Sequence, residues 1–342
     1  MRWPETSFRI VVSNVGSRTK GALVGVLSLA LAGCGGTLDA GQDNPREPLP
    51  VDASNPVVIC NDGPDDNLQG EYAMLLANGG GPPLAGIIVT TGGNWPNIDE
   101  NLAGWREMVA AARDGGLPDI PDPVASDAPV LVRPSDGDID STAPNQSAGA
   151  QFILDAAERL GRPDQPLVIA TGGRLTEVAD AYLMDHSLPD RVVVVASLGS
   201  VTPDGGDMGV PNGEQDTWAG VIVAQRFRYV QVSAFYDQLA DVAESRIAQL
   251  PINPFTSWLQ SKRTTVWDIP PAADQVSVLT VALPEFVTSV TRVVQVGEDS
   301  DGYPALSEDS EGPAWLVEEV NGDAATSRLW ELLLDPAMYR AE

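Results

Sequence analysis

The stretch Val57-Val58-Ile59-Cys60-Asn61-Asp62-Gly63-Pro64-Asp65-Asp66 joins a short apolar run to a run of side chains rich in oxygen. The apolar part has the length and composition of a strand that is buried on both faces of a sheet. The polar part begins where this strand would end. Because ligands of open α/β sheets bind at the carboxyl ends of the strands, the stretch predicts a central strand and one side of a binding site.

Apolar runs of the same kind recur further along the chain, and helical periods separate them. The runs cover residues 85–90, 130–132, 167–170, 192–196 and 229–232, and the helical periods cover residues 67–78, 97–112, 148–160 and 175–184. Strands that alternate with helices predict an α/β fold, with a mostly parallel sheet and helices on both faces. We expect one domain over residues 56–342, with a less regular part after residue 250.

The N-terminal residues have the pattern of a targeting segment. Four basic residues precede an apolar run over residues 22–31, which ends in Leu31-Ala32-Gly33-Cys34. This run is too short to cross a bilayer and suits a signal peptide, and its end resembles the lipobox of bacterial lipoproteins. We expect a signal peptide over residues 1–33, lipidation of Cys34, a flexible tether over residues 34–55, and anchoring in the bacterial cell envelope, on the periplasmic or the outer surface. The alternative is a buried N-terminal helix followed by an incidental cysteine.

The composition excludes several classes of protein. The formal net charge is -28, from 48 acidic and 20 basic residues, so the surface would repel a nucleic-acid backbone. The chain has two cysteines and one histidine, which excludes a disulfide framework and a histidine-rich metal site. No phosphate-loop, dinucleotide-binding or Gly-x-Ser-x-Gly motif is present. We predict that the single histidine, His186, is a solvated surface residue in a turn.

Polar residues follow most of the apolar runs at the point where each strand would end. They are Asn61 to Asp66, Thr90 to Asn94, Thr171 to Thr176, and a glycine-rich stretch that reaches Asn212 and Asp216. The adjacent carboxylates of Asp65 and Asp66 suit Ca²⁺, which takes six to eight oxygen ligands. Acids that complement the dipole of the next helix are the alternative, and the pair by itself favours this alternative.

Taken together, these segments resemble the nucleoside hydrolase family, the inosine- and uridine-preferring nucleoside N-ribohydrolases. Asn61 to Asp66 stands where the family has Asp-x-Asp-Pro-Gly-x-Asp-Asp, and Gly93-Asn94 matches the Gly-Asn after the second strand. Gly173-Arg174-Leu175-Thr176-Glu177-Val178-Ala179 is similar to Gly-Pro-Leu-Thr-Asn-Leu-Ala, Asn212 and Asp216 keep an Asn-x-x-x-Asp spacing, and Trp267-Asp268 stands in place of a His-Asp pair. The resemblance covers most of residues 56–334 and implies a Rossmann-like core.

The resemblance also implies an activity and a set of site residues. The family hydrolyses the N-glycosidic bond of nucleosides with a bound Ca²⁺, through an oxocarbenium-like transition state. Carried over by position, Asp66, Asp268 and the Thr176 carbonyl would ligate Ca²⁺, while Asp65, Asn94 and Asn212 would hold the ribose hydroxyls. The implied ligand is a nucleoside or related riboside, and the implied assembly is a homo-oligomer.

Four departures from the family pattern concern the chemistry. Asn61 stands where the family has its metal-binding aspartate and general base, and an amide can ligate Ca²⁺ but cannot accept a proton. Asp62 is the neighbouring candidate for that role. Val210 replaces a glutamate that contacts ribose, and Trp267 replaces a histidine, although an indole can stack on a base or sugar. Asp274 competes with Asp268 for the C-terminal ligand position.

Three hypotheses follow. The first is a Ca²⁺-dependent hydrolase of a riboside, held at the membrane by its lipid. The second is a riboside- or sugar-binding lipoprotein that keeps the metal pocket but has lost turnover, which Asn61 and Trp267 favour. The third is an interaction protein of the envelope surface, whose acidic loops are only solvated.

Overall fold

The computed structural model describes residues 48–63, 81–93, 95–117, 119–197, 211–232, 249–263, 275–298, 302 and 304–334. The chain divides into two compact units, Met1–Asn44 and Pro45–Glu342, and all described residues belong to the second.

A nine-stranded sheet forms the centre of this unit, in the order β3-β2-β1-β4-β5-β6-β9-β7-β8. The strands are β1 (Val57–Asn61), β2 (Leu84–Val89), β3 (Pro123–Ala125), β4 (Leu167–Thr171), β5 (Val192–Ala196), β6 (Arg228–Val232), β7 (Val287–Glu298), β8 (Pro304–Glu308) and β9 (Ala314–Val320). The first six strands are parallel to one another, β9 is parallel to β6, and β7 pairs antiparallel with β8 and β9.

The middle strands are buried on both faces, as their continuous apolar runs predict. Every residue of β1, β4 and β5 is buried. Parallel strands have this composition because the helices that connect them cover both faces of the sheet. The predicted α/β class, with a mostly parallel sheet, is therefore confirmed.

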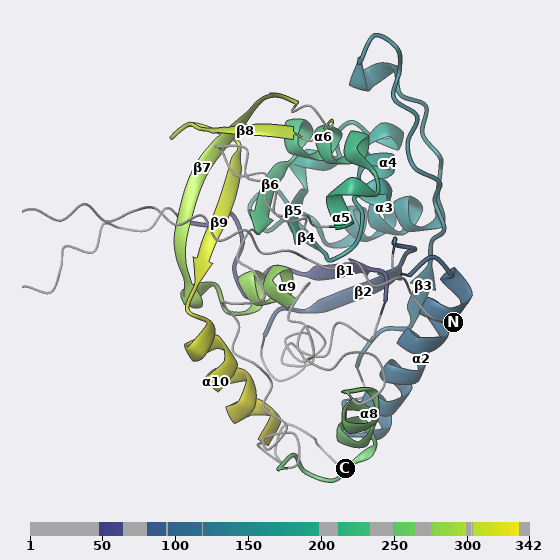
Figure 1. The fold of residues 1–342 in the computed structure, drawn as a ribbon, viewed down its shortest axis with the longest axis vertical. Coiled ribbons are helices and arrows are strands. Elements are labelled where there is room, and N and C mark those ends of the chain that lie inside the picture. Colours follow the sequence, from purple (N-terminus) through teal and green to yellow (C-terminus); the bar gives the residue numbers. More distant parts are fainter. Residues whose placement is uncertain are drawn as a thin grey trace, which may run out of the picture. The chain divides into compact units, whose positions relative to one another are not determined.

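Helices pack on the two faces as separate layers (Figure 1). The helices are α2 (Ile98–Asp114), α3 (Ala148–Leu160), α4 (Thr176–Met184), α5 (Pro211–Glu214), α6 (Thr217–Arg226), α8 (Pro254–Arg263), α9 (Gln275–Ala282) and α10 (Gly322–Leu334), and the 3₁₀ turns are η1 (Ile139–Ser141), η2 (Leu188–Asp190) and η3 (Pro284–Phe286). One apolar core lies between the sheet and α2, α8, α9 and α10. The other core lies between the sheet and α3, α4 and α6.

Local capping explains where two of the predicted helices begin and end. The Asn97 side chain accepts hydrogen bonds from the backbone N–H groups of Asp99 and Glu100, so α2 begins directly after it. Helix α3 covers the predicted residues 148–160, with Ser147 as its N-cap and Gly161 as its C-cap.

The prediction of a strand over residues 130–132 is wrong. The third strand is β3, and the side chains of Val130 and Val132 are 49% and 81% exposed. Three apolar residues in a row have no period that separates a strand from a loop, and here the segment runs over helices instead of joining the sheet. Its backbone is tied down where Leu131 N–H donates to Asp216 Oδ2 at 3.0 Å.

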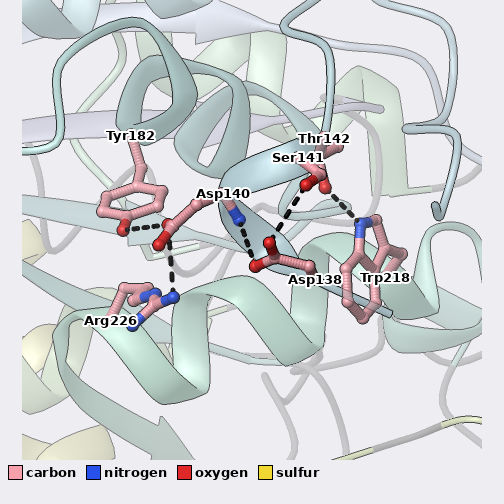
Figure 2. A network of polar contacts seen from close by, with 7 residues as sticks. All are labelled: Asp138, Asp140, Ser141, Thr142, Tyr182, Trp218 and Arg226. Carbon is pink, nitrogen blue, oxygen red and sulfur yellow. Dashed lines mark hydrogen bonds and ion pairs between the residues drawn. The ribbon is translucent and has the colours of Figure 1, made fainter. Parts of the chain in front are cut away.

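Polar contacts hold the rest of this long connection against α4 and α6 (Figure 2). Asp140 Oδ1 accepts hydrogen bonds from Tyr182 Oη and Arg226 Nη2, both at 3.2 Å, and Trp218 Nε1 donates to Thr142 Oγ1 at 3.1 Å. These contacts explain how a connection with only one 3₁₀ turn packs closely on the helix layer.

The C-terminal part is more regular than we predicted. It contains strands β7 and β8, which pair antiparallel, strand β9, which is parallel to β6 and antiparallel to β7, and the helices α8, α9 and α10. The segment Val287–Glu298 mixes buried, half-buried and exposed positions, so it lacks the continuous apolar run that marks the central strands. Within the described ranges, no helix is both long and apolar enough to span a bilayer.

Candidate functional site

The topology places a candidate site at the carboxyl end of β1. The chain passes from β1 to β2 and β3 on one side and then returns to β4 on the other side of β1. Such a change of direction is the switch point at which open α/β sheets bind ligands, because the loops diverge there. The ends of β1, β2 and β4 therefore form the first region in which to look for chemistry.

Asn61 and Asp62 lie at this point, and both side chains are buried. Asn61 Oδ1 accepts a hydrogen bond from Asp62 N–H, and Asp62 Oδ1 accepts one from Gly63 N–H at 2.7 Å. Asp62 Oδ2 lies so close to Gly92 that a Cβ at this glycine would overlap it. The absence of a side chain at residue 92 thus leaves the space that the carboxylate occupies.

Burial changes the proton affinity of this carboxylate. Asp62 is 3% exposed, and burial raises its pKa to about 6, although hydrogen bonds from backbone N–H groups and the charge of Arg174 act in the opposite direction. A carboxylate with a pKa near neutrality is suited to general acid–base chemistry.

Helix α2 braces the ends of β1 and β2. The indole Nε1 of Trp105 donates to the Asp62 carbonyl, and the amide of Asn101 donates to the carbonyls of Thr90 and Trp95, each at 2.9 Å. Gly92 and Trp95 exchange two backbone hydrogen bonds, which closes a tight turn after β2. The turn and the tip of β1 are consequently fixed to one helix face.

The turn after β4 packs against the tip of β1 from the other side. Gly172 N–H donates to the Cys60 carbonyl at 3.3 Å, and a Cβ at Gly173 would lie 3.6 Å from Asp62 N and 3.1 Å from Thr90 Oγ1. That Thr90 hydroxyl is buried and has no hydrogen-bond partner among the described residues. The switch point thus contains a buried hydroxyl whose hydrogen-bonding capacity no described residue satisfies.

Asn212 connects the tips of β4 and β5. Its side-chain amide donates to the carbonyls of Gly172 and Ser197, the latter at 3.0 Å. Asp216, four residues later, has a different role: it caps α6 by accepting from Ala219 N–H at 3.1 Å. Asn212 therefore lies at the tips of two strands, whereas Asp216 lies at the start of α6.

Comparison with solved structures identifies the fold. An inosine-guanosine nucleoside hydrolase superposes with a TM-score of 0.62 and 18% sequence identity, covering 83% of this chain and 100% of the other. A purine-preferring ribonucleoside hydrolase from Gardnerella vaginalis gives a TM-score of 0.57 and 17% identity, with 83% and 100% covered. The chain has the nucleoside hydrolase fold.

Two further results define the scope of this similarity. The type III effector protein XopQ, solved as a complex with adenosine diphosphate ribose, shares the nucleoside hydrolase fold with this chain at a TM-score of 0.57 and 13% identity, over 86% of this chain and 96% of the other. No protein-family model and no curated protein sequence matches the chain. The resemblance predicted from the motifs is thus confirmed through structure.

The structure brings together some of the predicted site residues. Asn61, Asp62 and Asn212 all lie at the carboxyl edge of the sheet, at the tips of β1 and beside those of β4 and β5. The predicted residues Cys34, Asp65, Asp66, Asn94, Val210, Trp267, Asp268 and Asp274 lie outside the described residues. Their roles stay predictions.

Thr176 lies in the first turn of α4, and its hydroxyl donates to Asp216 Oδ2 at 2.8 Å. Thr171, at the end of β4, is the threonine that pairs with Cys60 on β1 and is adjacent in the sheet to the Asn61 tip. The main-chain carbonyl of Thr171 accepts from Ser197 N–H at 2.9 Å. The strand pairing therefore places Thr171 beside the tip of β1, whereas the Thr176 hydroxyl contacts Asp216 at the start of α6.

Two of the described residues have side-chain oxygen atoms of the kind that a hard cation takes as ligands. Asn61 and Asp62 offer amide and carboxylate oxygens, which are the ligands that a hard cation such as Ca²⁺ takes. Within the described ranges, no three His, Cys, Asp or Glu side chains gather closely enough to hold a metal ion. The donor chemistry fits Ca²⁺, and a complete shell depends on the predicted ligands Asp66 and Asp268.

Several residues of the site had no assigned role in the sequence. Asn101 and Trp105 hold the strand tips, and Arg174 and Glu177 lie buried directly behind the β4 turn. The sequence did contain a sign that Arg174 and Glu177 are unusual, because they stand where the similar family segment has Pro and Asn. The roles of Asn101 and Trp105 could not be predicted in this way, because both residues also fit the pattern of an ordinary amphipathic helix.

Proposed function

We propose that the protein hydrolyses the N-glycosidic bond of a nucleoside or related riboside, with Asp62 as the general base. The observation that carries this proposal is a buried carboxylate at the switch point of a nucleoside hydrolase fold. Asn61 supports the same assignment by exclusion, because its amide cannot accept a proton whereas the neighbouring carboxylate can.

The reaction uses groups of the chain as follows. Asp62 takes a proton from a water molecule, whose oxygen bonds to the anomeric carbon as the bond from that carbon to the base nitrogen breaks. Ribose is held by Asn212 and by Asp65 and Asn94 of the predicted set. Ca²⁺, when bound through Asn61, Asp66 and Asp268, would orient ribose hydroxyls and lower the pKa of the attacking water.

The departing base takes its proton from solvent. The only histidine of the chain, His186, follows α4, which begins at the carboxyl edge of the sheet and runs toward the opposite edge. His186 is exposed and stacks on Tyr182 with ring centroids 4.8 Å apart. It lies away from the switch point and cannot act as the general acid there.

A release assay tests this proposal. Purified protein is incubated with inosine, guanosine and uridine, in Ca²⁺ or in excess chelator, and free ribose is measured. We expect ribose release that disappears with chelator and returns when Ca²⁺ is restored. Release that is unaffected by chelator would contradict the metal dependence, and no release from any riboside would contradict hydrolysis.

A riboside-binding protein without turnover is the second candidate. It is favoured by the near-complete burial of Asp62 and by its hydrogen bond with Gly63 N–H, both of which restrict the access of water to the carboxylate. In the same assay, this candidate predicts a rise in the melting temperature with riboside and Ca²⁺ but no free ribose, because a ligand that binds only the native state stabilises it.

We also propose that Cys34 carries a lipid that holds the protein in a bacterial membrane. The support is the basic stretch, the apolar run and the Leu31-Ala32-Gly33-Cys34 sequence. In a bacterial host, the protein is expected in the membrane fraction, and the substitution Cys34→Ser is expected to move it out of that fraction. An unchanged distribution would contradict lipidation.

A further inference from the structure

The side chain of Gln215 crosses the carboxyl edge of the sheet above the candidate site. Gln215 lies between α5 and α6, in the connection from β5 to β6. A Cβ at Gly93, in the turn after β2, would lie 3.6 Å from Gln215 Nε2 and 3.7 Å from its Cδ. Because β1 and β4 lie between β2 and β5 in the sheet, this contact passes over the tips of both strands.

Hydrogen bonds hold the chain on both sides of Gln215. Three residues before it, Nδ2 of Asn212 donates to two backbone carbonyls at the tips of β4 and β5. The residue after it, Asp216, accepts hydrogen bonds from Leu131 N–H at 3.0 Å and from Thr176 Oγ1 at 2.8 Å. The Gln215 side chain therefore extends from a well-anchored piece of backbone, and it does not depend on a loop movement to reach the strand tips.

The amide of Gln215 and the carboxylate of Asp62 contact neighbouring residues of one turn. A Cβ at Gly92 would overlap Asp62 Oδ2, whereas Gly93, the next residue, faces Gln215. Consecutive Cα atoms are about 3.8 Å apart, which is less than the length of a nucleoside. One bound molecule at the tip of β1 can therefore contact both side chains.

The Gln215 amide is available for such a contact. The residue is half-buried, and its amide has no hydrogen-bond partner among the described residues. An amide group carries two N–H donors and one oxygen acceptor. A ligand that bonds to this amide therefore displaces water and does not have to break a hydrogen bond within the described part of the protein.

The chemistry of the neighbouring groups indicates what the amide is needed for. An ionised carboxylate such as that of Asp62 accepts hydrogen bonds and donates none. The Nδ2 atom of Asn212 already donates to two backbone carbonyls. A sugar hydroxyl both donates and accepts, so its oxygen is satisfied only where the protein also offers a donor. Gln215 supplies an N–H group of this kind above the strand tips.

We propose that Gln215 contacts the bound riboside and donates a hydrogen bond from Nε2 to one hydroxyl oxygen of the sugar. The sugar is the partner because Gln215 reaches from the segment of Asn212 to the residue before Asn94, and both asparagines belong to the predicted ribose-holding set. Gln215 transfers no proton in this scheme, and it selects the sugars that fit. The inference deepens the proposed function and rests on it.

Two substitutions in the full chain separate hydrogen bonding from shape. Gln215→Met keeps the length of the side chain and removes the amide, whereas Gln215→Glu keeps an oxygen acceptor and removes the N–H donors. Gln151→Met is the matched control, because Gln151 is exposed on α3 and bonds to Asp155 at 2.9 Å, outside the proposed site. The substrates are inosine and its 2′-, 3′- and 5′-deoxy forms, each with Ca²⁺, and kcat/KM is measured from the release of hypoxanthine, their common product.

We expect Gln215→Met and Gln215→Glu to lower kcat/KM for inosine roughly tenfold, which is the effect of one lost hydrogen bond. For one of the three deoxy substrates, the parent protein and Gln215→Met should give equal values, because the hydroxyl that Gln215 contacts is already absent. Gln151→Met should match the parent with all four substrates. Without ligand, the melting temperature of Gln215→Met should equal that of the parent, which shows that the loss is not one of folding.

Three results would overturn the proposal. They are an unchanged kcat/KM for inosine in Gln215→Met, an equal loss for inosine and all three deoxy forms, and full activity of Gln215→Glu, which would exclude a donor role. If the parent protein binds ribosides without turnover, the same comparisons are made with dissociation constants from the ligand-induced rise in melting temperature. A parent protein that neither cleaves nor binds inosine would refute the proposed function together with this inference, whereas a parent that cleaves inosine no better than Gln215→Met would refute this inference alone.

Discussion

Substitution of Asp62 by asparagine is expected to reduce the rate of ribose release by about 10²–10⁴-fold, which is the usual contribution of a general base. Asparagine keeps the size of the side chain and an oxygen that can accept the hydrogen bond from Gly63 N–H, so the buried position remains filled. The substitution removes the negative charge and with it the ability to accept a proton. Steady-state release of ribose from inosine measures the effect.

The matched control for this prediction is Asp155→Asn. Asp155 is an exposed residue of α3 that accepts a hydrogen bond from Gln151 Nε2 at 2.9 Å, and it lies outside the proposed site. This substitution is expected to leave the release rate within about twofold of the parent, as is usual for a surface change without special contacts. Equal rates for Asp62→Asn and the parent protein would remove Asp62 from the role of base.

The free energy of unfolding is expected to fall as the pH rises from about 4.5 through 7, and Glu177→Gln is expected to remove part of this fall. Burial raises the pKa of Glu177 from 4.5 to about 7. Between these values the folded protein keeps the proton that the unfolded chain has released, so increasing pH favours unfolding. The contribution of this one group is about 3 kcal/mol, and it is complete above pH 7.

Urea unfolding between pH 4.5 and 8.5 tests this result. The difference in unfolding free energy between Glu177→Gln and the parent should shift by about 3 kcal/mol in favour of the variant over this range. Glu331→Gln, which removes an exposed carboxylate on α10, should show no such shift. A difference that stays constant with pH would show that Glu177 has an ordinary pKa in the folded protein.

The sequence predicted the central part of the fold because its signals there are local. The continuous runs that became β1, β4 and β5 are buried on both faces, and Ser147 and Gly161 mark the ends of α3 by capping. Strands β7 and β8 lacked such signals, since they pair with each other antiparallel and mix buried with exposed positions. Residues 130–132 show the converse case, because an apolar run alone cannot indicate whether a sheet edge is available to receive it.

The part of the candidate site that lies at the ends of the strands could be predicted, because the carboxyl ends of parallel strands meet at one edge of a sheet. Asn61, Asp62 and Asn212 were placed at one edge of the sheet from their positions after apolar runs, and the structure brings them there. The supporting residues could not be found in this way. Trp105 contacts the Asp62 carbonyl across 43 residues of sequence, and the surroundings of Glu177 involve three separate elements, so both depend on tertiary packing.

The point at which the chain enters the sheet lies opposite the candidate site. Residues 54–56 lie at the amino end of the strands, where the Asn55 amide donates to the Pro166 carbonyl at 2.8 Å and Val168 N–H donates to the Pro56 carbonyl. The switch point lies at the other end of the same strands. The described part of the chain thus enters the sheet at the end of the strands that is opposite to Asn61 and Asp62.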